Sequence, residues 1–126
     1  MESPYHDIQF RMGRFGAETL KLITPLKKAG IPASVVDQLV RSSTAVGANY
    51  GEARGAESRA DFAHKLQIAL KECREAKHWL TILREIPLAP QRTVTTLLAE
   101  CDQLCAILYC SVVTTKKTRQ DNVNNS

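Results

Sequence analysis

Apolar residues recur at spacings of three and four along most of the chain, which is the pattern of amphipathic helices. The first helix is predicted from about Tyr5 to the mid-twenties, where Pro25 either ends it or kinks its last turn. The segment from Ala29 to Pro32 contains glycine and proline and indicates a loop. The apolar stripe of this helix comprises Ile8, Met12, Phe15, Leu22, Ile23 and Leu26.

A second helix is predicted to begin at Ser34, because Asp37 stands three residues later, at the spacing of a capping box. Residues between Arg41 and Gly55 are unusually small, although each glycine inside a helix costs up to about 1 kcal/mol. We therefore expect a neighbouring helix to pack closely here, and Gly55 to end the helix. The predicted buried stripe comprises Val36, Leu39, Val40, Ser43, Gly47 and Tyr50.

A third helix is predicted from about Arg59 to Glu85, because Ser58 and Asp61 repeat the capping spacing just before it. Its apolar residues again recur at helical spacing and define one core-facing stripe. That stripe comprises Phe62, Leu66, Ala69, Leu70, Cys73, Ala76 and Leu80.

A turn bracketed by Pro87 and Pro90 leads to a fourth helix, predicted from about Gln91 to Lys116. Its core face comprises Val94, Leu97, Leu98, Cys101, Leu104, Cys105, Leu108 and Val112. Four long helices with short loops predict an all-α fold, an antiparallel up-down-up-down four-helix bundle, over residues 1–119. The polar residues 120–126 are expected to form a disordered tail.

Several large apolar residues lie off these core stripes. On the third helix they are Ile68, Trp79 and Ile82, and on the fourth they are Tyr109 and Val113. A monomeric bundle would leave them partly exposed to water, and exposed apolar clusters mark interfaces more often than they occur by accident. We therefore predict that these five residues contribute to self-association.

Composition and charge narrow the class of protein further. The chain of 126 residues carries 17 Lys+Arg against 13 Asp+Glu, a net charge of +4. Such an excess allows nucleic acid, an acidic protein or a membrane surface as partner, although ordinary solvated surfaces carry it too. No apolar run approaches the roughly 20 residues of a membrane span. Four cysteines without Cys-x-x-Cys spacing predict reduced thiols and a cytoplasmic location.

The searches for catalytic chemistry favour a non-enzymatic protein without metal or cofactor. Glu75 and His78 form one Glu-x-x-His element, whereas di-iron bundles need two such elements and two further glutamates. Cys73, Cys101 and Cys105 face the predicted core, where three thiolates could hold a soft metal. Cysteine is also a common buried residue that packs as a small apolar group, and we favour this interpretation.

Basic residues are the remaining candidates for function. Lys71, Arg74 and Lys77 lie three residues apart on one side of the third helix, and Lys116, Lys117 and Arg119 form a run without acids near the end of the fourth. Either group could be a solvated face, and cations also complement a helix C-terminus. In a symmetric oligomer, however, each group would be repeated around an axis and could contact several phosphates.

Residues in the middle of the chain resemble a known family. The segments Gln38–Ser43 and Ala48–Ala53, followed by Gly55, Ser58, Asp61 and Phe62, are similar to the pattern QLRRAxxSxxxNIAEGxGRxSxxEF of the 23S ribosomal RNA intervening-sequence proteins. The similarity extends from Asp7-Ile8 to about Glu85, and the fourth helix matches only in pattern. Three positions depart from the family pattern: Val40, Ala53 and Ala56. Val40 and Ala56 replace arginines, which weakens the expectation that nucleic acid binds at this loop.

The resemblance implies a bacterial four-helix bundle that assembles into a ring-like homopentamer without a catalytic site. One branch of the family, the accessory variability determinant of diversity-generating retroelements, associates with a reverse transcriptase and with RNA or DNA. The matching Arg41, Asn49 and Glu52 could satisfy backbone groups, pair across subunits or contact a ligand. Two functions are therefore expected: an oligomeric scaffold that binds nucleic acid, or a protein-interaction module that docks an acidic partner.

Overall fold

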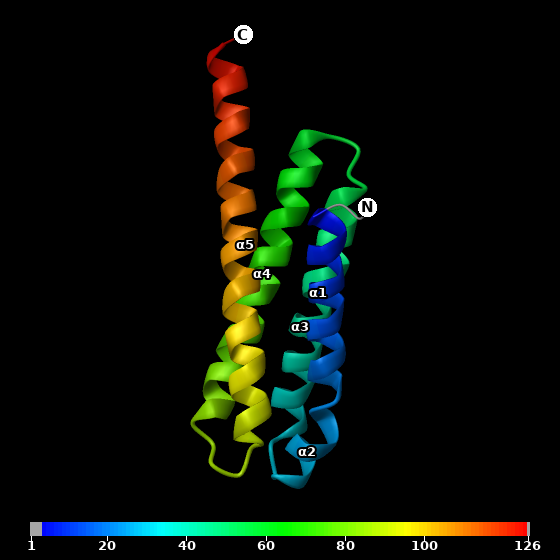
Figure 1. Ribbon diagram of the computed structural model, residues 1–126, viewed down its shortest axis with the longest axis vertical. Coiled ribbons are helices and arrows are strands. Elements are labelled where there is room, and N and C mark those ends of the chain that lie inside the picture. The colour runs from blue at the N-terminus through cyan, green and yellow to red at the C-terminus, as the bar shows by residue number, and fades with distance from the viewer. Residues whose placement is uncertain (1–3, 126) are drawn as a thin grey trace.

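The computed structural model describes residues 4–125, and the side chains within 7–125 except those of 119 and 122. The described chain contains α1 (Pro4–Leu20), α2 (Ile23–Lys28), α3 (Ala33–Arg54), α4 (Arg59–Arg84) and α5 (Gln91–Asn124), with no strand among them. Figure 1 shows that α2 and the α4–α5 loop lie at one end of the molecule, while the α3–α4 loop lies at the other. The predicted helical bundle with four long helices is confirmed.

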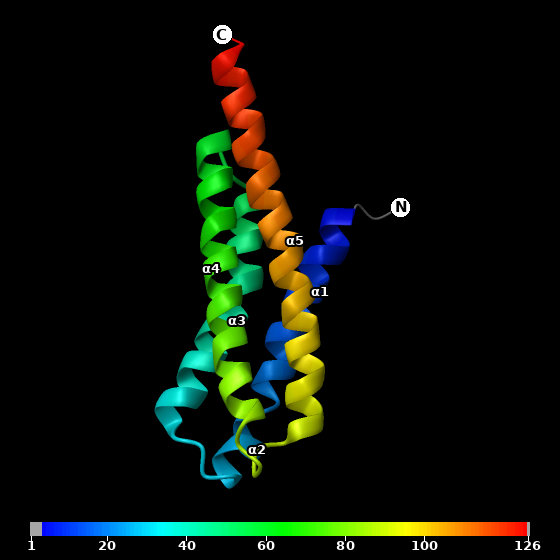
Figure 2. The same ribbon diagram turned by 90° about the vertical axis from the view of Figure 1, so that its left-hand side faces the viewer.

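All four long helices and the short α2 contribute side chains to one core. α3 packs against both α1 and α4, α5 packs along α4, and α1 touches α5 over a shorter length. Figure 2 shows α4 and α5 running alongside each other on one side of the bundle. The largest fully buried residues are Met12, Phe15, Leu26, Val36, Leu39, Val46, Leu66, Leu80, Leu83, Val94, Leu104 and Leu108.

The first predicted helix is divided in two just before Pro25. The ring of Pro25 cannot donate a hydrogen bond to Lys21 and would clash with its carbonyl, so the helix cannot continue through this point. The chain instead makes a turn in which the backbone N–H of Leu22 donates to the carbonyl of Thr19 over 2.9 Å. Helix α2 then restarts with Pro25 in its first turn, where no donor is needed.

The two capping predictions have opposite outcomes. Ser58 Oγ accepts a hydrogen bond of 3.0 Å from the backbone N–H of Asp61, which confirms the predicted start of α4. The predicted capping box at Ser34 is wrong, because α3 begins at Ala33 with Pro32 as its N-cap. The carbonyl of Pro32 already accepts from the N–H of Val36, so Ser34 lies inside the first turn.

Helix α5 is longer than the sequence pattern indicated. It continues to Asn124, so residues 120–124 are helical where a disordered tail was expected. No glycine or proline interrupts the polar segment after Lys116, and nothing in it forces the helix to stop. Figure 1 shows this C-terminal part of α5 extending past the α3–α4 loop and away from the other helices.

Part of α5 resembles a membrane-spanning segment by length and composition. Residues Gln91–Thr118 are long and apolar enough to cross a membrane on these criteria alone. The core helix of a helical bundle satisfies the same criteria, and α5 buries Leu98, Cys101 and Leu108 in the core.

The small residues of α3 allow α1 to approach closely, as their spacing predicted. A Cβ atom on Gly47 would lie 3.3 Å from Met12 Cβ and 3.4 Å from the backbone nitrogen of Gly13. By contrast, a Cβ atom on Gly13 would meet no heavy atom within 4 Å. The close approach therefore depends on Gly47.

Replacing Gly47 by valine is expected to lower the free energy of unfolding by about 1–3 kcal/mol, because α1 must move outward. Gly13→Ala is the matched control, and it is expected to raise that free energy by about 0.5–1 kcal/mol through helix propensity alone. Urea denaturation of both variants measures the difference. Equal stability of the Gly47→Val variant and the wild type would contradict the packing described here.

Candidate functional site

The α4/α5 face combines exposed cations with an exposed aromatic ring. Lys71 and Arg74 are exposed on α4, and neither forms a salt bridge with a described residue. The guanidinium carbon of Arg74 lies 6.0 Å from the centroid of the Tyr109 ring on α5, at the outer limit of a cation–π contact. Tyr109 keeps 54% of its surface exposed, and Val113, four residues further along α5, keeps 44%.

Lys77 differs from the two other cations of this predicted group. Its Nζ forms a salt bridge of 2.8 Å with Asp102 on α5. The hydrogen bond and the charge of Asp102 raise the pKa of Lys77. Because Asp102 offsets its charge, Lys77 adds little to the positive potential of this face.

The second basic group lies near the C-terminal end of α5. Lys116 and Lys117 are exposed, and no salt bridge to either is formed within the described part of the chain. The side chain of Arg119 lies outside the described residues. Spacings of four and three residues place Tyr109, Val113 and Lys116 on the same side of α5.

A polar network joins α3 and α4 on the opposite flank of α4. Arg41 on α3 binds Glu72 over 2.9 Å and also binds Glu75, to which the indole nitrogen of Trp79 donates over 3.2 Å. Burial alone would raise the pKa of Glu75, but the hydrogen bonds from Arg41 and Trp79 outweigh it, and the pKa is lowered. Arg41, one of the family-motif residues, therefore acts here as a link between two helices.

The five predicted interface residues do not form one patch. The bond from Trp79 to Glu75 places this residue near α3, whereas Tyr109 lies beside Arg74 between α4 and α5. At 100° per residue, Ile68 and Ile82 fall on the Trp79 side of α4, with Lys71 and Arg74 between them and α5. Trp79 and Ile68 are partly buried, and Ile82 keeps 38% of its surface exposed. The basic residues are thus flanked by apolar residues on both sides.

The remaining motif residues make contacts within the chain. Asn49 donates to the carbonyl of Ala45 over 2.9 Å, and Glu52 forms a salt bridge of 2.9 Å with Lys65. Gly55 is the C-cap of α3, and Ser58 caps α4. Phe62 is partly buried and packs against the core.

Two ion pairs at the edges of the bundle could not be predicted from the sequence. Arg11 on α1 donates to Glu100 and Gln103 on α5, over 3.2 Å and 2.8 Å, and Lys77 pairs with Asp102 as described. These partners are 25 to 92 residues apart in the sequence, and no local pattern marks them. Which charges pair depends on the rotation of each helix about its axis, and that rotation is known only from the packed structure.

The three cysteines of the core come together between α4 and α5. Cys73 Sγ lies 3.8 Å from Cys101 Sγ and 3.0 Å from Cys105 Sγ. Hydrogen bonds to Cys105 and Cys73 raise the pKa of Cys101, and burial adds to this effect. Hydrogen bonding with Cys101 and Cys73 lowers the pKa of Cys105, the most exposed of the three.

Replacing Arg41 by methionine is expected to lower the free energy of unfolding by about 1–3 kcal/mol. Glu72 is only 9% exposed, and its carboxylate would lose its charged partner. Arg54→Met is the matched control on the same helix, and an exposed substitution there is expected to change stability by less than about 0.5 kcal/mol. Adding Glu72→Gln to Arg41→Met is expected to restore part of the loss, and a further loss would refute this assignment.

The fold is that of a helical bundle built from four long helices. The family model described as 23S rRNA-intervening sequence protein matches residues 12–110. The chain belongs to this family, as its motif residues indicated, and the match extends further into α5 than those residues did. Lys116, Lys117 and Arg119 lie beyond the matched segment.

A solved structure supports the same relationship. The chain is similar to a protein with unknown function from the S23 ribosomal protein family of Bacteroides thetaiotaomicron VPI-5482, with 28% sequence identity and a TM-score of 0.77. The alignment covers 83% of this chain and 97% of that chain. A comparison with proteins of curated function finds no match.

Proposed function

We propose that this protein is a non-enzymatic scaffold that assembles as a homopentamer and binds RNA or DNA through the α4/α5 face. In this assembly each subunit is an antiparallel up-down-up-down bundle, and the ring repeats the basic face around its axis. The observation that carries the proposal is the group of Lys71, Arg74 and Tyr109: Arg74 lies beside the exposed ring, Lys71 is a second exposed cation one turn away on α4, and neither cation forms a salt bridge with a described residue.

These three side chains match the chemistry of a nucleic acid. Lysine and arginine bind phosphate oxygens, and an exposed tyrosine ring can stack on a base. Lys116 on the same side of α5 lengthens the basic face toward the C-terminus, and Lys117 follows it. One subunit offers only a few phosphate contacts, so useful affinity requires several copies of the face.

Exposed apolar residues favour self-association. Ile82, Tyr109 and Val113 are more exposed than large apolar residues that stabilise a core, and Phe10 and Leu20 on α1 are also exposed. Side chains of this kind on two flanks of a subunit suit contacts between different faces of neighbouring copies. Contacts between unlike faces close into rings when the rotation between copies allows it.

A scaffold without catalysis is consistent with the groove between α1 and α5. This groove of about 360 Å³ is lined by Arg14, Phe15, Glu18, Thr96, Leu97, Glu100 and Gln103. These lining residues include no cysteine, histidine or serine, and of the two carboxylates Glu18 is paired with Lys21 over 2.9 Å. Glu100 is also engaged by Arg11.

Fluorescence anisotropy with labelled single-stranded RNA and duplex DNA tests the proposal. In low salt the wild type is expected to bind, and Lys71→Glu with Arg74→Glu is expected to weaken binding by about tenfold or more, roughly 1.4 kcal/mol. Lys27→Glu with Lys28→Glu is the matched control, because it changes net charge equally on α2. Equal losses from both double variants would show that only net charge matters, which would contradict a specific face.

The same face could instead dock an acidic protein, since Tyr109 and Val113 offer apolar contacts beside the cations. A purified protein that binds neither RNA nor DNA, but retains an acidic partner after nuclease treatment, would replace the nucleic-acid proposal with this one. Loss of that partner in the Lys71→Glu, Arg74→Glu variant would then show that the acidic partner docks on the α4/α5 face.

A further inference from the structure

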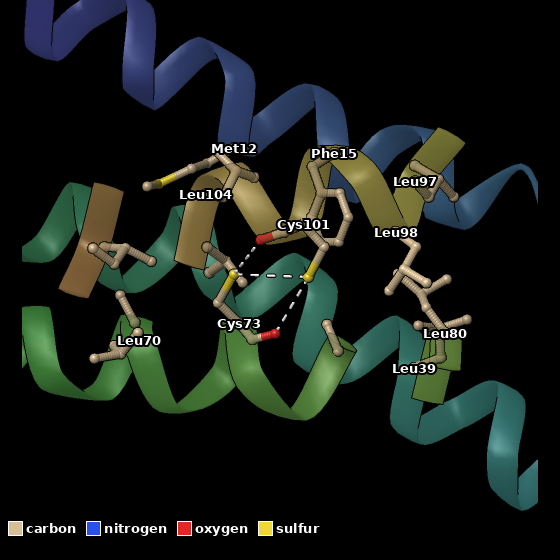
Figure 3. Close-up of a cluster of buried hydrophobic side chains, with 14 of the residues drawn as sticks. Met12, Phe15, Leu39, Leu70, Cys73, Leu80, Leu97, Leu98, Cys101 and Leu104 are labelled. Atoms are coloured by element: carbon tan, nitrogen blue, oxygen red, sulfur yellow. Dashed lines mark hydrogen bonds between the residues drawn. The ribbon is translucent and has the colours of Figure 1, made fainter. Parts of the chain in front are cut away.

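Three cysteine sulfurs from two helices form a compact cluster in the core. Cys73 comes from α4, while Cys101 and Cys105 lie one turn apart on α5 and both face it. The three Sγ atoms all lie within 4.8 Å of one another. Figure 3 shows Cys73 and Cys101 pointing toward each other between the two helices. The cluster therefore forms because α4 packs against α5, and it does not result from local spacing alone.

Two of the three cysteines are buried among apolar side chains, and the third lies closer to the protein surface. Cys73 and Cys101 are fully buried, and Leu104 lies beside Cys73 while the ring of Phe15 lies beside Cys101 (Figure 3). Cys105 is partly exposed, at the edge of the cluster that faces solvent. A small ion can therefore reach the cluster at Cys105 and be enclosed by apolar side chains beyond it.

We propose that Cys73, Cys101 and Cys105 bind one monovalent copper ion. All three donors are sulfur, and among the described residues no histidine or carboxylate belongs to the group. Soft thiolate ligands select monovalent copper, zinc or iron–sulfur clusters. Structural zinc needs a fourth ligand, which this group lacks, whereas three sulfurs complete a trigonal site for a soft ion.

The distances between the sulfurs are close to those that such a site requires. Three sulfurs placed about 2.3 Å from a central metal, a typical metal–thiolate distance, lie about 4 Å apart in a planar arrangement. The separation of Cys73 and Cys101 is already 3.8 Å, and that of Cys73 and Cys105 must open from 3.0 Å. A movement of about 1 Å between these two side chains brings this pair to the trigonal spacing, and Cys101 and Cys105 already lie within 4.8 Å of each other.

Binding requires no change in the oxidation state of copper. Each coordinating thiol releases its proton to solvent, and the ion remains monovalent throughout. The thiols of Cys73 and Cys101 give up hydrogen bonds of 3.6 Å and 3.4 Å to each other's backbone carbonyls. Thiols are weak donors, so this exchange is inexpensive.

The test is an anaerobic titration of the reduced, full-length protein with Cu(I) buffered by bicinchoninate. We expect one Cu(I) per chain, a thiolate-to-copper absorbance band that saturates at that ratio, and a higher melting temperature. Cys105→Ser is expected to lower the affinity at least a hundredfold, and this position is partly exposed, which limits the risk to folding. Cys110→Ser is the matched control, because Cys110 is exposed on α5 and outside the cluster.

Cys101→Ala provides a second variant that cannot ligate at a fully buried position, and circular dichroism establishes whether each variant is folded. Three outcomes would overturn the proposal. They are the absence of saturable binding, loss of binding in Cys110→Ser but not in Cys105→Ser, and tighter binding of Zn²⁺ than of Cu(I). None of these measurements depends on nucleic-acid binding.

Discussion

Raising the salt concentration from 50 to 200 mM is expected to weaken duplex DNA binding by about a thousandfold. Each phosphate that a lysine or arginine neutralises releases condensed counterions, so affinity falls steeply with salt when about six contacts form. Lys71, Arg74, Lys116 and Lys117 supply at most four such contacts per subunit. Six contacts therefore require at least two subunits of a ring on one duplex, whereas one subunit with four contacts would lose only about a hundredfold. The slope of the salt dependence thus reports whether more than one subunit contacts the duplex.

Anisotropy of a labelled duplex at four or more salt concentrations measures this slope. The Lys71→Glu, Arg74→Glu variant is expected to show a much shallower dependence, whereas Lys27→Glu with Lys28→Glu is expected to keep the wild-type slope. A wild-type loss of about a hundredfold or less across the same range would mean that the face acts in single copies, and a flat response would exclude phosphate contacts altogether.

Replacing Leu104 by alanine is expected to have the largest effect on stability, lowering the free energy of unfolding by about 2–5 kcal/mol. Leu104 is fully buried on α5, next to the cysteine cluster and near Met12 of α1 (Figure 3). Its loss removes apolar burial and leaves a cavity that helices fixed by their neighbours cannot close.

Urea denaturation measures this loss, with all variants at one protein concentration because subunit association contributes to apparent stability. Leu88→Ala is the matched control, since Leu88 in the α4–α5 loop keeps 78% of its surface exposed and is expected to change stability by less than about 0.5 kcal/mol. Similar losses in the two variants would place Leu104 outside the core.

The core could be predicted from the sequence because its signal is local and periodic. Leu66, Leu80 and Leu104 each repeat at helical spacing with apolar neighbours, and all three are fully buried. The starts of the helices were harder to predict, because they depend on which group accepts hydrogen bonds from the first backbone N–H groups of each helix. Ser58 has no competitor for that role, whereas at Ser34 the preceding Pro32 already ends the loop.

The candidate site could be predicted only in part. Helical spacing correctly indicated that Lys71 and Arg74 are exposed, because exposure follows from the position of the core stripe on the same helix. It could not show that Asp102 pairs with Lys77, because the two residues meet only when α4 and α5 pack at one particular rotation. For the same reason the contact between Arg41 and Glu72 was not predicted, and three core thiols were expected without their mutual distances.

The mass of the free protein in solution, from light scattering coupled to size exclusion, tests the central proposal most directly. The exposed cations of one subunit, Lys71 and Arg74, make a persuasive nucleic-acid surface only when several copies act together. We expect a single species with a mass near five times the 14.0 kDa of the chain. A species at 14.0 kDa, unchanged as concentration rises, would contradict the scaffold.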